Sequence, residues 1–281
     1  MKVLCRDLGK MDYAACWELQ RSLFDSLVAA KTGLRNANPA GSGSKDEAAG
    51  TILLVEHPPV YTLGKSGHAE NLLVDRPALE RLGARFFHID RGGDITFHGP
   101  GQLVCYPILD LERLGIGLRD YIDRLEETVI RTVARYGIAA GRIAGASGVW
   151  LGEEATMETG AGNKESGRPE SPQTTRDTLS PKSPGTEKEG TKNEEAEKRD
   201  PLRKICAIGV RSSRYVTMHG FALNVTTDLG WFSRINPCGF SDRGVTSIAR
   251  ETGRDAAMDE VKRLVLRELE EQLGIKVEYE N

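Results

Sequence analysis

The chain lacks the residue patterns that mark disulfide-rich or metal-binding proteins. Its 281 residues contain five cysteines, an odd number, at positions 5, 16, 105, 206 and 238 and with no C-x-x-C pair. Such spacing supports neither a disulfide framework nor a zinc ribbon. The five histidines show no H-x-x-x-H or H-x-H spacing, so we predict no metal site. Each cysteine is then either a small core residue or a reactive thiol with a function, and we expect four of them to be core residues.

The chain also lacks a long apolar run and an excess of positive charge. No apolar run reaches the roughly 18–20 residues that span a bilayer. The first residues, MKVLCRDLGKMDYAACW, carry acidic side chains where a signal peptide would be apolar. The formal net charge of −3 does not favour nucleic-acid binding. We therefore expect a cytoplasmic protein that binds neither membrane nor nucleic acid.

Residues 153–200 have almost no apolar side chains, with no aromatic residue, no valine and no isoleucine. Such a segment buries too little apolar surface to offset the entropy of ordering, so we predict a disordered insertion. A regulatory role and a tolerated loop expansion both fit; the tolerance of loops to insertion favours the second. Residues 36–50 have a similar composition and are predicted to be a second loop expansion. The rest of 1–281 has the size of a single domain.

Periodicity predicts both helices and strands in what remains. Apolar residues recur every three or four positions over residues 12–31, 118–133 and 258–273, which predicts three helices. Short apolar runs predict strands at residues 51–56, 85–90, 103–109, 148–151, 204–210 and 216–225. Without the insertion, the strands at 148–151 and 204–210 would form a β-hairpin. Because the elements show no regular βαβ rhythm, we predict an α+β fold with helices packed on a mixed or largely antiparallel sheet.

Three segments contain residues that a core does not require. The first is RGGDITFHGPG (91–101), whose four glycines allow the backbone to approach a ligand closely. The second is KICAIGV (204–210), followed by TMHGFALNV (217–225). If the side chain of Lys204 points inward, it places a charge in the interior, which is costly and therefore indicates a function. The third is RINPCGF (234–240), where Cys238 lies in a predicted turn outside any periodic apolar run. An accessible cysteine near a cation would be partly ionised at neutral pH. A Cys–Lys pair with Lys204 and a Cys–His dyad with His98 or His219 both remain open on spacing alone.

Together these segments resemble the octanoyl-[acyl carrier protein]:protein N-octanoyltransferases, also called lipoyl(octanoyl) transferases. The resemblance rests on RGGDITFHGPGQLVCYPILDL (91–111), GVWLG (148–152), KICAIGVRSSRYVTMHGFALNV (204–225) and INPCGF with the later VTSI. It implies a biotin/lipoate-protein-ligase-like fold, Cys238 as the acyl-thioester residue and Lys204 as its partner. It further implies that the substrate is bound by Arg91, Gly92, Gly93, Asp94, Ile95, Thr96, Phe97, His98, Ala207, Ile208, Gly209, Gly220, Phe221 and Ala222. The insertion at 153–200 departs from the family pattern, but the motifs on both sides of it are intact.

The resemblance implies an acyltransferase of lipoate biosynthesis that needs no cofactor. Octanoyl-acyl carrier protein would be the donor, and lysines on the lipoyl domains of 2-oxoacid dehydrogenase subunits and on the glycine cleavage H protein would be the acceptors. We expect the enzyme to be a monomer. Three alternatives stay open: an ATP-dependent lipoate or biotin ligase, a non-catalytic binding module, and octanoyl transfer between two lipoyl domains. The presence of both Cys238 and Lys204 favours transfer over the first two.

Overall fold

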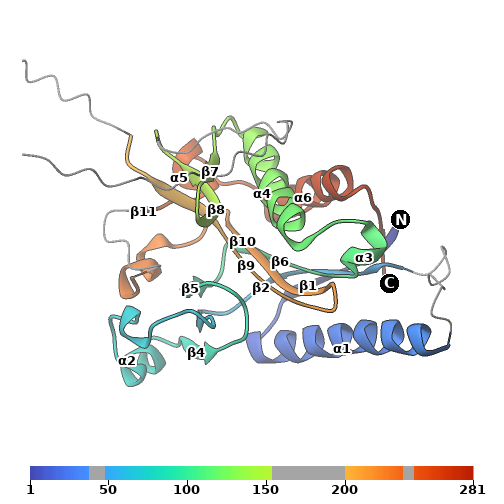
Figure 1. The fold of residues 1–281 in the computed structure, drawn as a ribbon. Coiled ribbons are helices and arrows are strands. Elements are labelled where there is room, and N and C mark those ends of the chain that lie inside the picture. Colours follow the sequence, from blue (N-terminus) through green and yellow to red (C-terminus); the bar gives the residue numbers. More distant parts are fainter. Residues whose placement is uncertain (38–47, 154–199, 237–243, 281) are drawn as a thin grey trace, which may run out of the picture.

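The computed structural model describes residues 1–37, 48–153, 200–236 and 244–280. In these residues the main sheet is mixed, with strand order β12-β1-β2-β6-β10-β9-β8-β7 and with β11 beside β9. These strands are β1 (Lys2–Lys10), β2 (Gly50–Glu56), β6 (Gln102–Leu109), β7 (Gly141–Ile143), β8 (Ala146–Leu151), β9 (Arg203–Ser213), β10 (Val216–Asn224), β11 (Gly244–Val245) and β12 (Lys276–Tyr279). The parallel pairs of β1 with β2 and with β12 bring the two ends of the chain together (Figure 1).

Helices cover both faces of this sheet, with α1 on one face and α4 and α6 on the other (Figure 1). In the described ranges the helices are α1 (Tyr13–Ala37), α2 (Arg76–Arg81), α3 (Leu111–Leu114), α4 (Leu118–Ala134), α5 (Ile248–Thr252) and α6 (Met258–Leu273), and 3₁₀ turns span Ala69–Asn71 and Leu229–Arg234. The three predicted helices correspond to α1, α4 and α6. Among the described residues, no helix has both the length and the apolar character needed to cross a bilayer.

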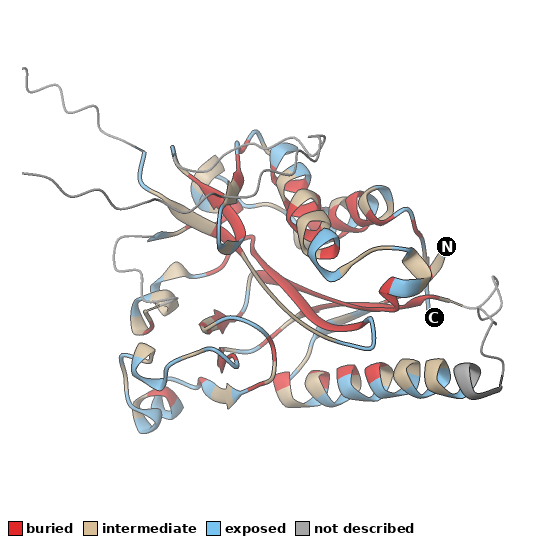
Figure 2. Ribbon diagram, in the orientation of Figure 1, coloured by how far each residue is buried: buried red, intermediate tan, exposed pale blue. Residues whose placement is uncertain are grey.

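Strand β6 shows why the sheet is covered twice. All of its residues are buried (Figure 2), and alternate side chains point to opposite faces. Leu103 and Cys105 belong to the core under α4 and α6, whereas Val104 and Tyr106 belong to the core under α1. A nearly continuous apolar run is typical of a strand buried on both faces. Each fully buried large side chain stabilises the fold by about 1.5–3 kcal/mol relative to exposure.

A smaller sheet with the order β4-β3-β5 packs beside the main one. It contains β3 (Val60–Leu63), β4 (Arg85–His88) and β5 (Ile95–His98). The predicted strand at 85–90 therefore belongs to this second sheet. The predicted glycine-rich loop at 91–101 is not a plain turn, because β5 forms within it and pairs antiparallel with β3.

The predicted hairpin between the strands at 148–151 and 204–210 is confirmed, because β8 pairs antiparallel with β9 and Leu151 lies opposite Arg203. Residues 154–199 of the predicted insertion lie outside the described residues. Of the predicted loop at 36–50, residues 38–47 lie outside the described residues, while α1 continues to Ala37 and β2 begins at Gly50. Ala49 is buried and bonds to Lys2 and Asp110 through its backbone.

Candidate functional site: a cavity beside Lys204

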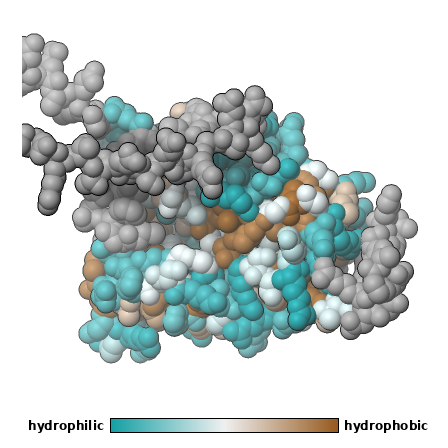
Figure 3. All heavy atoms as spheres, in the orientation of Figure 1, coloured by the Kyte–Doolittle hydropathy of each residue, from teal (hydrophilic) through white to brown (hydrophobic). Residues whose placement is uncertain are grey.

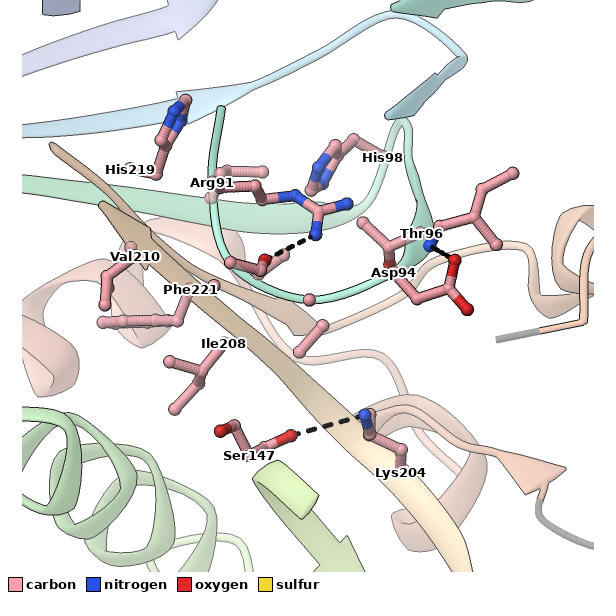
Figure 4. A pocket seen from close by; sticks show the side chains of 18 of the residues that line it. Arg91, Asp94, Thr96, His98, Ser147, Lys204, Ile208, Val210, His219 and Phe221 are labelled. Carbon is pink, nitrogen blue, oxygen red and sulfur yellow. Dashed lines mark hydrogen bonds between the residues drawn. The ribbon is translucent and has the colours of Figure 1, made fainter. Parts of the chain in front are cut away.

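A cavity of about 350 Å³ lies where the segment 91–98 crosses β9 and β10. This volume is at the lower end of the roughly 300–1,000 Å³ of small-molecule sites. Its lining includes Ile122 of α4, residues 145–147 and Trp150 at β8, Lys204 and residues 207–210 of β9, and residues 219–222 of β10. Figure 4 shows the side chains of Arg91 and His98 on one side of β9 and those of Ile208 and Phe221 on the other. On the molecular surface, a stripe of apolar side chains runs between α1 and α4 (Figure 3).

Most of the predicted substrate-binding residues line this cavity. These are Arg91, Gly92, Gly93, Asp94, Ile95, Thr96, His98, Ala207, Ile208, Gly209, Gly220, Phe221 and Ala222. Phe97, predicted as a pocket wall, is not among the residues that line this cavity. Its neighbours Ile95, Thr96 and His98 on β5 line the cavity, whereas the Phe97 side chain is fully buried. The Phe97 ring stacks on Trp231 with 5.2 Å between ring centroids, in a buried aromatic cluster.

Arg91 holds the glycine-rich segment in place. Its side chain is buried, and Nη2 donates to the carbonyl oxygen of Thr62 at 2.7 Å and to its hydroxyl at 3.0 Å. A Cβ on Gly209 would lie 3.0 Å from Cδ of Arg91 and 2.9 Å from the carbonyl oxygen of Gly92. A larger residue at position 209 would therefore push this segment away from β9. Arg91 and Gly209 therefore shape the cavity by keeping this segment close to β9.

Asp94 connects the cavity to the segment that precedes Cys238. Its carboxylate accepts hydrogen bonds from the backbone of Ile95 at 2.7 Å and from the side-chain amide of Asn71 at 2.6 Å. The carbonyl oxygen of Asn71 in turn accepts the backbone N–H of Asn236 at 2.8 Å. Asn236 is the last described residue before the range 237–243, so the predicted nucleophile Cys238 lies outside the described residues.

Lys204 lies beside the residues that follow the range 237–243. Its Nζ donates to the carbonyl oxygen of Ser147 at 3.4 Å and lies 4.3 Å from the centre of the Trp150 ring. Val245, just after the range 237–243, pairs with Lys204 in the register of β11 and β9. Val245 itself also lines the cavity.

The two histidines considered as dyad partners both line the cavity near Arg91 (Figure 4). The ring of His98 contacts Gln102 Oε1 at 2.9 Å, and burial lowers the pKa of His98 to about 3. His219 Nε2 lies 3.0 Å from Asp90 Oδ1, and burial lowers the pKa of His219, opposed by Asp90. A neutral His219 that donates from Nε2 fits the pKa of Asp90, which the same hydrogen bond lowers to about 2. Its backbone has φ +63°, which is unusual for a residue with a side chain.

Several lining residues were not anticipated from the sequence. They include Tyr13 of α1, Ile122 of α4, Ser147 and Trp150 of β8, and Asn224 of β10. Trp150 and Asn224 occur inside motifs that carried the resemblance, GVWLG and KICAIGVRSSRYVTMHGFALNV, which was the available signal. Tyr13 and Ile122 fit helix periodicity equally well, so only the packing of α1 and α4 reveals their contact with the cavity.

Comparison with known proteins points to one family. The family model described as "Lipoyl protein ligase A/B catalytic domain" matches residues 12–270. A protein named octanoyltransferase from Bacteroides fragilis (strain YCH46) is 45% identical over 269 residues, covering 96% of this chain and 97% of the relative. An octanoyltransferase from Bacteroides thetaiotaomicron is also 45% identical, over 276 residues and with 98% and 97% of the two chains covered.

Among solved structures, a putative lipoate protein ligase from T. acidophilum aligns with a TM-score of 0.58 at 14% identity, covering 100% of this chain and 88% of that one. At this identity the likeness concerns the fold alone, and the expected biotin/lipoate-ligase-like fold is confirmed. The sequence relatives carry the further step. The chain belongs to the lipoyl protein ligase A/B catalytic-domain family, among its octanoyltransferases, and is an acyltransferase.

Proposed function

We propose that this acyltransferase moves an octanoyl group from octanoyl-acyl carrier protein to a lysine of a lipoyl domain, in the biosynthesis of protein-bound lipoate. The acceptors would be the lipoyl domains of 2-oxoacid dehydrogenase subunits and the glycine cleavage H protein. The main support for this proposal is the position of Lys204. It lies beside a cavity that combines apolar walls with a glycine-rich segment, in a chain about 45% identical to octanoyltransferases. A cytoplasmic location and a monomeric state remain predictions.

The reaction would proceed in two acyl transfers. In the first, the thiolate of Cys238 attacks the donor thioester carbonyl, a new C–S bond forms, and the carrier thiol leaves. In the second, the ε-amine of the acceptor lysine attacks the Cys238 thioester, an amide C–N bond forms, and the C–S bond breaks. The amine proton ends on a base or on the departing thiolate. Because an amide is more stable than a thioester, the transfer needs no ATP.

The other cysteines are poor candidates for the nucleophile. Cys5, Cys16, Cys105 and Cys206 are all buried, as expected for core residues. Burial raises the pKa of Cys5 and Cys16 to about 12 and raises that of Cys206 as well, so their thiols stay protonated at neutral pH. Cys206 is only two residues from Lys204, yet its side chain belongs to the main core. This supports Cys238 as the thiol that acts.

The role proposed for Lys204 is to favour the thiolate and to accept protons during transfer. A nearby cation stabilises a thiolate, and an amine in a partly desolvated site can also serve as a base. The walls near Lys204 include Ile208 and Phe221, which suit an acyl chain. Backbone N–H groups of the glycine-rich segment are candidates to stabilise the tetrahedral oxyanion.

The test is an assay with purified enzyme, octanoyl-acyl carrier protein and an apo lipoyl domain, without ATP. The expected result is a mass increase of one octanoyl group on the lipoyl domain. A parallel reaction supplies free octanoate and ATP, and a third supplies an octanoylated H protein as donor. Acylation only with octanoate and ATP would identify a ligase, and acylation only from the H protein would identify transfer between lipoyl domains. Either result would refute the proposed donor.

A further inference from the structure

A buried carboxylate on α4 lies behind the Lys204 site. Glu126 is 6% exposed. Its Oε1 accepts the backbone N–H of Gly148 at 3.0 Å, and its Oε2 lies 3.2 Å from Nε of Arg142. A buried carboxylate is costly unless it is paired, and burial raises the pKa of Glu126 while Gly148 and Arg142 oppose that rise. The position of Glu126 is therefore defined by two partners, one of them a backbone group of β8.

The peptide bond that Glu126 binds is the same one that binds Lys204. The N–H of Gly148 and the carbonyl of Ser147 belong to one planar peptide group, and in a trans peptide they point in opposite directions. The N–H end contacts Glu126, and the carbonyl end accepts the hydrogen bond from Lys204 Nζ at 3.4 Å. Hydrogen bonds in such a chain polarise one another, so a carboxylate on the N–H makes the carbonyl a stronger acceptor. The carboxylate and the ammonium are linked through one peptide.

The backbone at Gly148 packs tightly against β9, so this peptide cannot move closer to that strand. Gly148 has φ +121°, a conformation that residues with a Cβ rarely adopt. A Cβ there would lie 2.6 Å from the carbonyl oxygen of Cys206 and 3.4 Å from Cε of Lys204. The peptide therefore contacts both the strand and the side chain of Lys204. The ring of Trp150, also on β8, lies under the same ammonium, with 4.3 Å between Nζ of Lys204 and the ring centroid.

From these contacts we infer that Glu126 is a positioning residue for Lys204, acting through the peptide between Ser147 and Gly148. The carboxylate fixes the carbonyl that holds the ammonium beside the acyl cavity. The effect on rate rests on the proposed function, because it requires that Lys204 takes part in the transfer. The effect on the position and reactivity of the Lys204 amine does not depend on that function.

Glu127 provides a matched control. It follows Glu126 on α4 and binds the same arginine, with its Oε2 2.8 Å from Nη2 of Arg142. Its Oε1 pairs with Arg131 at 2.9 Å. Replacing Glu127 with Gln removes a charge of the same sign from the same helix and weakens the same Arg142 site. The comparison therefore separates the contact with Gly148 from the general loss of a carboxylate.

The experiment compares E126Q, E126D and E127Q with the unmodified enzyme. The reactivity of the Lys204 amine is measured with isotope-labelled acetic anhydride near pH 8, followed by peptide mapping. We expect acetylation at Lys204 to be about three- to tenfold faster in E126Q, because a weaker acceptor leaves more of the amine uncharged. In steady-state transfer, kcat of E126Q should fall about tenfold with KM for the donor unchanged within about twofold. E126D, which keeps the charge at a shorter reach, should be intermediate, and E127Q should match the unmodified enzyme.

Equal Lys204 reactivity and equal kcat in E126Q and E127Q would overturn the inference. Faster acetylation in E126Q together with full transfer activity in K204A would uphold the positioning of Lys204 while refuting its role in the proposed function. Circular dichroism checks that each variant is folded. Should E126Q not fold, the same two measurements on E126D and E127D decide the question, with altered Lys204 reactivity in E126D alone as the supporting result.

Discussion

The ammonium of Lys204 lies where two different groups stabilise positive charge. The carbonyl oxygen of Ser147 accepts its hydrogen bond, and the face of the Trp150 ring lies 4.3 Å away. A cation over an indole gains about 0.5–2 kcal/mol, depending on how far it is removed from water. Both groups come from β8, and the partner strand β9 carries the lysine. This arrangement keeps a cation beside the cavity, where a thiolate or an oxyanion would need one.

Replacing Lys204 should separate its two proposed roles. K204A is expected to lose at least about a hundredfold in kcat, the usual cost of removing an acid–base group. K204R keeps the charge but cannot accept a proton at neutral pH. Substantial activity in K204R would assign the residue a purely electrostatic role, whereas loss in both variants would assign a proton-transfer role. The measurement is the pH–rate profile of transfer, and full activity in K204A would contradict any role for Lys204.

At the scale of single residues, the glycine-rich segment and Lys204 could be singled out from the sequence, because those residue types have no reason to lie in a core, and both contribute to the lining of the cavity. The sequence did not reveal that Phe97 packs against Trp231, since a contact between residues so far apart in the chain is set by the fold. It could not indicate Glu126, which follows Leu125 on the apolar face of α4 and is buried with it. Its significance depends on Gly148 and Arg142, two residues whose proximity only the fold establishes.

Among the elements, β10 and β6 lie close together at a glycine. Gly220 lies on β10, and a Cβ there would be 2.2 Å from the carbonyl oxygen of Cys105 on β6. Backbone atoms cannot yield as a flexible side chain can. The close approach brings the cavity-lining part of β10 against the centre of the sheet.

Replacing Gly220 with Ala should therefore destabilise the protein by about 2 kcal/mol or more, because the two strands must separate. The measurement is the free energy of unfolding from urea titration. Gly33 in α1 offers the opposite case, because nothing lies within 4 Å of a Cβ at that position. Gly33→Ala should stabilise the protein by about 0.5–1 kcal/mol, since alanine is favoured in a helix. A Gly220→Ala variant as stable as Gly33→Ala would contradict the close approach.

Elements with strong periodicity were predictable, and those without it were not. Helices α1, α4 and α6 and strands β2, β6, β8, β9 and β10 lie near their predicted positions. Strands β1 and β12 alternate weakly; they pair with each other across almost the whole length of the chain, and β1 also pairs with β2. Strand β5 lies between glycines and is defined by its pairing with β3. These pairings are long-range, so a local pattern does not reveal them.

For the whole molecule, the insertion joins two strands that are already paired. Leu151 of β8 lies opposite Arg203 of β9, so a short turn would suffice to connect them. Deleting residues 154–199 should leave kcat/KM for octanoyl transfer within about twofold, in line with the tolerance of surface loops to changes in length. A folded deletion variant that has lost most of its activity would show that the segment has a function of its own.

The stability of the whole molecule should fall in mild acid because buried histidines are neutral in the folded state. Burial lowers the pKa of His57 to about 4 and that of His98 to about 3. The unfolded chain takes up these protons near pH 6.5 and the folded chain does not, so stability is lost as the pH falls below about 6.5. The expected loss between pH 7 and pH 5 is about 2 kcal/mol for each histidine. In His57→Gln the loss measured by urea unfolding should be smaller by that amount; an unchanged pH dependence would contradict this assignment.

In the proposed mechanism the acyl group passes through a thioester on Cys238. The most direct measurement is the intact mass of the enzyme after mixing with octanoyl-acyl carrier protein in the absence of ATP and acceptor, followed by peptide mapping. We predict one octanoyl adduct on the peptide containing Cys238, lost in Cys238→Ser and kept in Cys206→Ala, whose thiol is buried two residues from Lys204. An adduct that survives in Cys238→Ser, an adduct that requires ATP, or no adduct at all with an enzyme that still transfers octanoyl would contradict the account.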